Sequence, residues 1–324
     1  MDKEFFDFKS FASTLDKVRK SSDKIKYTCC IPGCNSKSLL HSHIIPQCVL
    51  KKYVCNDKNE LIQCQIDEIH PMSMMETGEI PLEKFATVGI EKAMSLPLFC
   101  KHHDNVLFCE FEKNAEASAP YEKRFQILQA LRAIGAMRHI NEKLLIQNEL
   151  KGQKDEFYKL NIYEEEQQVY KNIITRSDTT IFTLYQSIKN NDYSNYEFIC
   201  IELDLLKIAI CDLVVDEDDL SKYIMNDAYN NPLNALYITL LPQNKHSYLI
   251  LGYNKKYVSK EQENKFLQWK EALKSKTDLR TIYNILCHCS NNWCISPDCD
   301  IHFINYLKEN YFIDRMNVNF NIDE

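Results

Sequence analysis

The sequence is poor in glycine, with six in 324 residues, and it has no Gly-rich loop or Walker-type motif to cradle a nucleotide phosphate. It also lacks the G-x-S-x-G motif that carries the nucleophile of many serine hydrolases. Nucleotide hydrolysis and serine-hydrolase chemistry are therefore set aside. No apolar run approaches the roughly 20 residues of a membrane span, and the charged segment after Met1 has no apolar core of a signal peptide. These absences predict a cytoplasmic protein that does not bind a membrane.

Cysteine is abundant by contrast, with 14 in the chain. Because nothing in the sequence marks secretion, the thiols are expected to be reduced. Most of them, such as Cys200 and Cys211 in apolar runs, are expected to be small buried hydrophobic residues. A cluster near the C-terminus consists of Cys287, His288, Cys289, Cys294 and Cys299. Its spacings do not make two clean ligand pairs, so a packed turn is favoured over a second metal site.

The net charge of −7 argues weakly against a nucleic-acid partner, because phosphate binding needs cations. The distribution of charge weakens this objection, since residues 17–52 carry eight Lys and Arg against one acid. The candidate phosphate contacts are Lys37, Lys51 and Lys52 in this stretch and, further along, Lys123, Arg124, Arg132 and Arg138. The alternative, a solvated surface on which charges cluster by chance, stays open.

Hydrophobic patterning predicts an α+β chain in two parts, an N-terminal domain over residues 1–118 and a C-terminal domain over 119–324. Helices are expected over 3–20, from Leu98 onward, over 121–150, within 155–191, within 260–288 and over 300–310. Short apolar or alternating runs separated by polar turns predict antiparallel strands at 196–204, 208–216, 234–243 and 246–254. The C-terminal part is therefore expected to be an antiparallel sheet with helices, preceded by a helical segment.

Two sequence blocks carry most of the candidate chemistry. The first, CCIPGCNSKSLLHSHIIPQ, contains Cys29, Cys30 and Cys34 on a short turn. The second, LPLFCKHHDN, has Cys100 and His103 in a C-x2-H spacing at the expected start of a helix, where residues three apart share a face. A structural zinc site needs four sulfur or nitrogen ligands, commonly from two short-spaced pairs. The first pair is Cys34 with either Cys29 or Cys30, and the spacing slightly favours Cys29.

The order of these features resembles the HNH nuclease superfamily (His-Me finger, ββα-metal), specifically its zinc-knuckle members. In that family a cysteine pair precedes a strand that ends in a histidine followed by Ile or Val and Pro. The second zinc pair then opens a helix, with a metal-binding residue directly after it. Here His43-Ile44-Ile45-Pro46 matches the strand end and Cys100-Lys101-His102-His103-Asp104 matches the helix. The resemblance covers residues 25–115 and implies a ββα-metal core stabilised by structural zinc.

The resemblance also implies roles for individual residues. His43 would be the general base, and Asp104 would bind a catalytic divalent ion, Mg²⁺ or Mn²⁺. The family usually has a metal-binding Asp or His before the base, where this chain has Ser42, and His41 could substitute because it shares a strand face with His43. The asparagine that orients the base in the family falls near Ser95. Two further carboxylates on the helix, Glu110 and Glu112, are expected to be structural, because a rise of ~1.5 Å per residue places them too far from Asp104 to share its ion.

These residues predict a metal-dependent HNH-type endonuclease that hydrolyses phosphodiester bonds of DNA. The combination of an HNH core with an unrelated C-terminal domain resembles anti-phage defence nucleases. In that setting the second domain would position the substrate, regulate activity or bind a partner, and the expected partners besides DNA are a regulatory protein or a second copy of the chain. One alternative is a catalytically degenerate, zinc-stabilised module that binds nucleic acid or protein, favoured by Ser42 and the net negative charge. Another is a subunit whose partner supplies the DNA contacts.

Overall fold

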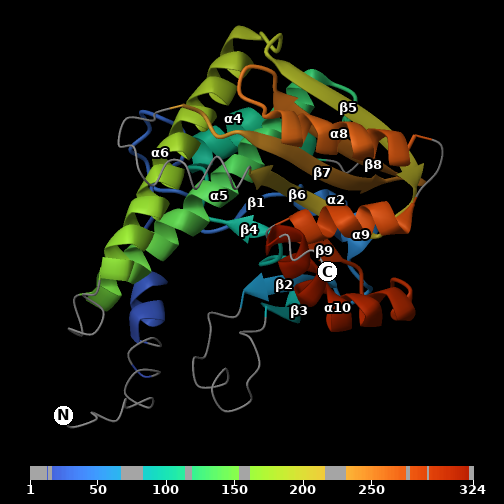
Figure 1. Cartoon of the computed structure of the whole chain (residues 1–324), viewed down its shortest axis with the longest axis horizontal. Coiled ribbons are helices and arrows are strands. Elements are labelled where there is room, and N and C mark those ends of the chain that lie inside the picture. Colours follow the sequence, from blue (N-terminus) through green and yellow to red (C-terminus); the bar gives the residue numbers. More distant parts are fainter. Residues whose placement is uncertain are drawn as a thin grey trace.

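A seven-stranded antiparallel sheet lies at the centre of the fold, with strand order β3-β2-β9-β6-β7-β8-β5 (Figure 1). The strands are β2 (Glu60–Ile66), β3 (Glu83–Gly89), β5 (Tyr196–Asp204), β6 (Ile208–Val215), β7 (Ala235–Gln243), β8 (His246–Asn254) and β9 (Trp293–Ile295). The computed structural model describes residues 13, 17–66, 83–113, 119–152, 161–215, 231–274, 278–289 and 292–320. Within these ranges, strands from the two ends of the sequence meet, because β2 pairs with β9 and β9 pairs with β6.

The central strands are buried on both faces, and their residues alternate between two hydrophobic cores. In β7, Ala235 and Tyr237 belong to one core, whereas Leu236 and Ile238 belong to the other. This division follows from the geometry of a strand, in which successive side chains point to opposite faces of the sheet. Continuous burial along β7 therefore means that both faces of the sheet are covered.

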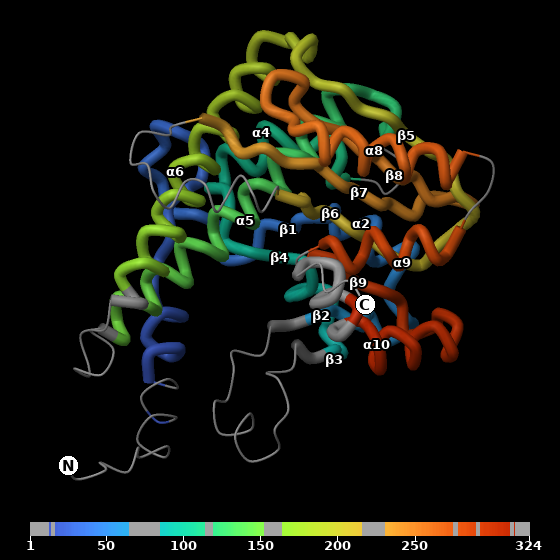
Figure 2. The backbone as a smooth tube through the Cα atoms, viewed as in Figure 1, coloured from blue at the N-terminus to red at the C-terminus, as the bar shows by residue number. Residues whose placement is uncertain are grey.

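Helices cover both faces. On one side α5 (Lys123–Gly152) contacts β6 and β7, and α6 (Asn161–Asn190) packs along α5 (Figure 1). The other side carries α8 (Lys260–Ala272), α9 (Leu279–His288) and α10 (Ile301–Phe320), which contribute Phe266, Trp269, Ile282, Leu307 and Tyr311 to the second core. The tube view shows β2 and β3 beside β9 and α10, although more than 200 residues separate them in sequence (Figure 2).

A small strand–strand–helix unit lies in the first core. Strand β1 (Ser42–His43) pairs antiparallel with β4 (Ser95–Leu96), and α4 (Lys101–Glu112) follows β4 after four residues. Between β1 and β4 the chain forms α2 (Gln47–Val49) and the π-helix η1 (Leu50–Val54), and then enters the large sheet through β2 and β3. The unit is thus anchored to the sheet by the segment that interrupts it.

The α+β class expected from the sequence is confirmed. The helix expected over 121–150 is α5, and the four strands expected between 196 and 254 are β5 to β8. Residues 17–22 are helical, and apart from residue 13, also helical, the rest of the helix expected over 3–20 lies outside the described residues. The domain boundary expected at 118/119 falls between α4 and α5, and the large sheet takes strands from both sides of it. None of the helices in the described ranges is long and apolar enough to cross a membrane.

Candidate metal centre and adjoining cleft

The first two cysteine ligands are positioned by a tight turn. An isolated bridge joins Thr28 to Lys37, and the amide of Cys29 donates to the Ser36 carbonyl at 2.9 Å. Gly33 has φ +80°, a left-handed conformation that glycine adopts without strain. The turn therefore brings the side chain of Cys34 back toward that of Cys29.

The second pair comes from the start of α4. Cys100 is the N-terminal flanking residue of the helix, and its carbonyl accepts from the amide of Asp104 at 2.9 Å. His103 lies three residues after Cys100, so both side chains leave the same side of the first turn. The edge of the His103 ring also meets the Tyr185 ring of α6, with centroids 5.9 Å apart.

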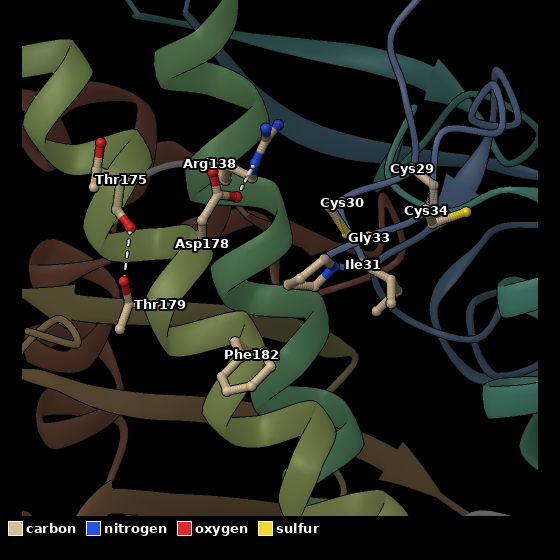
Figure 3. Close-up of a pocket in the computed structure, with 11 residues that line it drawn as sticks. Cys29, Cys30, Ile31, Gly33, Cys34, Arg138, Thr175, Asp178, Thr179 and Phe182 are labelled. Atoms are coloured by element: carbon tan, nitrogen blue, oxygen red, sulfur yellow. Dashed lines mark hydrogen bonds and ion pairs between the residues drawn. The ribbon is translucent and has the colours of Figure 1, made fainter. Parts of the chain in front are cut away.

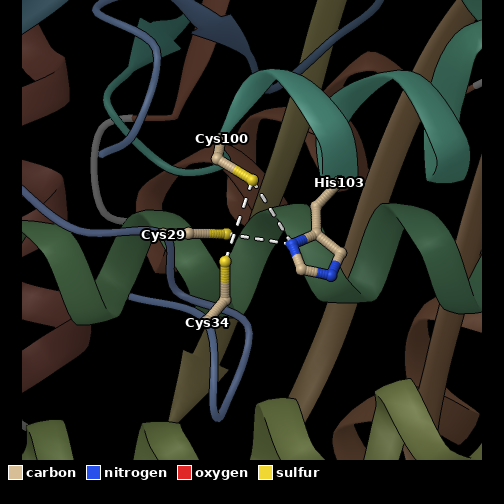
Figure 4. Close-up of side chains that lie close together, drawn as sticks. All are labelled: Cys29, Cys34, Cys100 and His103. Atoms are coloured by element: carbon tan, nitrogen blue, oxygen red, sulfur yellow. Dashed lines mark hydrogen bonds between the residues drawn. The ribbon is translucent and has the colours of Figure 1, made fainter. Parts of the chain in front are cut away.

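The four side chains converge on one point (Figure 4). Cys34 Sγ lies 3.8 Å from Cys100 Sγ, and His103 Nδ1 lies 3.5 Å from Cys29 Sγ and 3.4 Å from Cys100 Sγ. A tetrahedral zinc ion, with bonds of about 2.3 Å to sulfur and about 2.0 Å to nitrogen, would set these separations near ~3.8 Å and ~3.5 Å. All four donor atoms lie within 4.8 Å of one another, and no other such group occurs in the part of the chain that the structure describes. These residues can therefore hold a metal ion such as zinc.

The environment of the thiols also suits a bound cation. Burial raises the pKa of Cys29 to about 12, because a thiolate is poorly solvated there. The hydrogen bond from the Ser36 backbone lowers the pKa of Cys34, which is closer to solvent. Metal binding requires deprotonated thiols, so an ion would supply the positive charge that a buried Cys29 thiolate lacks.

Cys30 is excluded from the quartet, which resolves the choice that the spacing left open. Its amide donates to the Leu98 carbonyl at 2.9 Å, and its side chain lies against Gly135 of α5 in the first core. Burial raises the pKa of its thiol well above the usual value. Cys30 thus packs the turn onto α5, whereas Cys29 faces the metal centre.

A cleft of about 410 Å³ lies beside the metal centre and gathers most of the expected catalytic residues. Its lining consists of His41, His43, Gln47, Cys48, Lys51, Asp104 and Glu112. The expected base and the expected ligand of the catalytic ion therefore open onto the same space. The carrier elements are β1 for His43 and the first turn of α4 for Asp104.

His43 is held in one orientation by the backbone. Its Nε2 lies 3.3 Å from the Ile90 carbonyl oxygen, which can only accept, so Nε2 carries the proton and Nδ1 is left as the acceptor. Burial lowers the pKa of the ring, which keeps it neutral near pH 7. Ser95, near which the family's orienting asparagine falls, is the partner of His43 in the β1–β4 pair, and its hydroxyl lies 3.3 Å from His41 Nδ1.

Ser42, the residue that was considered as a metal ligand, lies near Asp104. Ser42 is only 1% exposed, and its hydroxyl accepts from the Phe99 amide at 3.3 Å. The same hydroxyl donates to the Phe99 carbonyl at 3.5 Å. Burial raises the pKa of Asp104, and the nearby Arg132 and Ser42 side chains lower it by less. Ser42 is absent from the lining of the cleft, so it ties β1 to the segment before α4 rather than facing an ion.

Glu112 lines the cleft, a placement that the sequence interpretation missed. Only the distance along the helix was considered from the sequence, and it is too long for Glu112 and Asp104 to share an ion. Residues eight apart nevertheless lie on the same side of a helix, and this periodicity could have placed Glu112 in the cleft. Glu112 forms an ion pair with Arg132 of α5, which is 1% exposed. The guanidinium lies 4.0 Å from the centroid of the Phe108 ring, and its Nε and Nη1 have no hydrogen-bond partner among the described residues.

Some of the candidate phosphate contacts are exposed, whereas others are already paired with acidic side chains. Lys37, Lys51, Lys52 and Lys123 are exposed and Arg124 is half-buried. Arg132 is buried against Glu112, and Arg138 pairs with Glu142 and Asp178 beside a hollow of about 670 Å³ next to the cysteine turn (Figure 3). Arg132 is therefore buried with its acidic partner, and the charge of Arg138 at the hollow is balanced by two acids.

The C-terminal cysteine cluster lies at the end of α9, on strand β9 and in the turn that follows it, where a packed turn was expected. Cys287, Cys289 and Cys294 are buried in the second core, and Cys299 lies against it. In the described part of the cluster these thiols and His288 do not form a metal-binding group.

Comparisons of the chain with protein-family models, with curated proteins and with solved structures find no match. The interpretation of function therefore depends on the residues of this chain and on the geometry just described.

Proposed function

We propose that the chain is a zinc-stabilised, metal-dependent endonuclease of the HNH type that hydrolyses DNA. The observation that carries the proposal is the placement of His43 and Asp104 on one cleft, next to a quartet able to hold structural zinc. A structural zinc site alone would require neither residue. The order β1, β4, α4 supports the same interpretation, because it is the strand–strand–helix order of that superfamily.

In this mechanism His43 acts as the general base. Its Nδ1 takes a proton from the attacking water while the water oxygen forms a bond to phosphorus and the bond from phosphorus to the leaving oxygen breaks. The hydrogen bond from Nε2 to Ile90 fixes the ring and supports the charge that it gains. Because burial lowers the pKa of His43, the base is ready in its neutral form near pH 7.

Asp104 is the residue that would hold the catalytic ion. Its carboxylate suits Mg²⁺ or Mn²⁺, hard cations that are usually bound by one or two carboxylates together with substrate phosphates and water. When bound, such an ion supplies positive charge against the phosphate and the leaving oxygen. Burial raises the pKa of Asp104, and Arg132 and Ser42 partly offset this effect. A bound cation would favour the ionised carboxylate further. The context we propose is anti-phage defence in the cytoplasm, by analogy of domain arrangement alone.

Nicking of a supercoiled plasmid tests the proposal. Wild type, His43→Ala and Asp104→Ala are compared in Mg²⁺ or Mn²⁺ at equal zinc content, with His302→Ala on the exposed side of α10 as the matched control. Loss of a general base lowers rates by about 100-fold or more, so His43→Ala should be nearly inactive and His302→Ala fully active. Cleavage by His43→Ala at the wild-type rate would contradict the mechanism.

The second candidate is a zinc-stabilised binding module without catalysis. It is favoured by the burial of Ser42, which leaves Asp104 without the neighbouring ligand found in the family. This module would bind DNA or a protein partner and leave the plasmid intact in every metal tested. Retention of a labelled duplex on a filter, with no nicking by wild type, would favour it.

A further inference from the structure

A second depression, of about 580 Å³, adjoins the His43/Asp104 cleft. Its lining consists of Gln47, Lys51, Lys58, Asn59, Gly89, Ile90, Glu91 and Lys92. Two of these residues, Gln47 and Lys51, also line the cleft. The two hollows therefore form one continuous groove, which we call the η1 groove because Lys51 of η1 lies at its middle.

The walls of the new half are turns held by hydrogen bonds. Pairing of Glu60 with Gly89 in the β2–β3 hairpin brings the turn before β2 next to the turn after β3. The Ile90 amide donates to the Asn59 carbonyl at 3.0 Å and joins the two turns. Lys58 and Lys92 each project from one of these turns, so the hairpin fixes where both cations lie.

The η1 groove is electrically polarised along its length. Lys51, Lys58 and Lys92 are exposed, and none forms an ion pair with a described residue, whereas Glu91 is the only acid among the described residues that line that end. The other end carries the two carboxylates of the cleft. An arrangement of this kind places a cation at the acidic end and phosphates at the basic end, in a molecule whose net charge is −7.

We propose that the η1 groove binds the sugar-phosphate backbone of duplex DNA, with Lys58 and Lys92 contacting phosphates next to the one in the cleft. This inference rests on the proposed function, since it extends the substrate away from the scissile bond. Contacts of ammonium groups with phosphates set position and register without reading sequence. The turn that presents Lys92 also carries the Ile90 carbonyl that orients His43. The same turn would therefore hold the DNA strand and fix the general base.

The test measures binding separately from cleavage. Anisotropy of a fluorescent 20-base-pair duplex is titrated against full-length Lys58→Ala/Lys92→Ala at several salt concentrations. The matched control is Lys260→Ala/Lys270→Ala, two exposed lysines of α8 on the opposite side of the sheet. Each lost phosphate contact reduces the magnitude of the slope of log K against log salt by about 0.9. The magnitude of this slope should therefore fall by about 2 in the groove variant and stay unchanged in the control. The KM of the groove variant for nicking should rise several-fold while its kcat stays unchanged, because neither Lys58 nor Lys92 lines the cleft.

The outcomes separate this inference from the nuclease proposal. If the groove variant loses affinity but wild type never cuts, the groove is supported and the nuclease is overturned. Equal affinities and slopes for the groove variant and the α8 control overturn the groove, whether or not the plasmid is nicked. A loss of affinity for single-stranded RNA without any change for duplex DNA would overturn the choice of DNA. Zinc content and circular dichroism confirm that both double variants are folded.

Discussion

Adjacent cysteines have opposite surroundings at the metal centre. Cys29 Sγ faces His103 Nδ1 at 3.5 Å, whereas Cys30 Sγ packs toward Gly135. We expect Cys29→Ala to abolish zinc binding and to lower the melting temperature strongly, because zinc binding contributes directly to folding. Cys30→Ala should keep one zinc per chain and lose about 1 kcal/mol of stability from the cavity it leaves. Metal analysis of the purified proteins and thermal melts check this, and equal zinc in the two variants would contradict it.

The Arg132–Glu112 ion pair ties α5 to the cleft. Removing the carboxylate in Glu112→Leu leaves a guanidinium that is 1% exposed without its partner, and breaking a buried pair in this way costs about 3–5 kcal/mol. The double variant Arg132→Met/Glu112→Leu should regain most of this stability, since well-packed apolar side chains can replace a buried pair. A double-mutant cycle by urea unfolding measures the coupling. Additive losses would show that the pair does not act as a unit.

At the scale of single residues, the sequence predicted which side chains form the group that could hold a metal better than it predicted the lining of the cleft. The C-x2-H spacing and the turn sufficed because both ligand pairs are local in sequence. The spacing only slightly favoured Cys29 over Cys30, because it does not reveal the turn closed by the Thr28–Lys37 bridge, in which Cys29 joins the quartet. Glu112 was missed because a distance along α4 was considered and the shared helix side was not.

At the scale of secondary-structure elements, strand β8 contains a glycine, Gly252, that is covered by a side chain of a neighbouring strand. Gly252 pairs with Phe198 of β5 and with Tyr237 of β7, and the rings of these two residues stack with centroids 6.3 Å apart. A Cβ at Gly252 would lie 2.1 Å from the Phe198 ring. Gly252→Ala should therefore cost about 1–3 kcal/mol, the usual cost of overpacking. Urea unfolding measures the loss.

Gly135 of α5 supplies the matched control. A Cβ there would have neighbours no closer than 3.6 Å, which is ordinary van der Waals contact. Gly135→Ala should be neutral or stabilising by up to about 1 kcal/mol, because alanine is favoured over glycine inside a helix. Equal effects of the two substitutions would show that the Phe198 ring does not cover Gly252 tightly.

The same strands show what local pattern can predict. Strands β5 to β8 follow one another along the chain, and short apolar or alternating runs between polar turns identified them. Strand β9 has three residues, Trp293–Ile295, inside a segment expected to be a packed turn. Its pairing with β2 and β6 depends on contacts between distant parts of the sequence, so periodicity could not place it. For that reason the joining of both ends of the chain in one sheet was not predicted.

At the scale of the whole molecule, two histidines on opposite sides of the sheet link stability to pH. His139 of α5 and His288 of α9 each have a pKa lowered to about 4, first because of burial and also because of nearby Lys143 and Lys265. In the unfolded chain both titrate near the usual value of about 6.5. The unfolded state therefore binds more protons between these values, and stability is present above pH 6.5 and lost as the pH falls toward 4.

The expected loss for wild type is on the order of 2 kcal/mol per histidine between pH 6.5 and pH 5, at about 1.4 kcal/mol per pH unit. Urea unfolding at a series of pH values measures it. His139→Phe/His288→Phe removes both groups and should make the curve less steep in this range, while the exposed His302→Phe should retain the wild-type slope. The three cysteines and His103 of the metal centre, His43 and the carboxylates are common to all three proteins, so their own titrations cancel in the comparison. A double variant as steep as wild type would mean that groups other than these two histidines take up the protons, and the assignment of the acid sensitivity to His139 and His288 would be wrong.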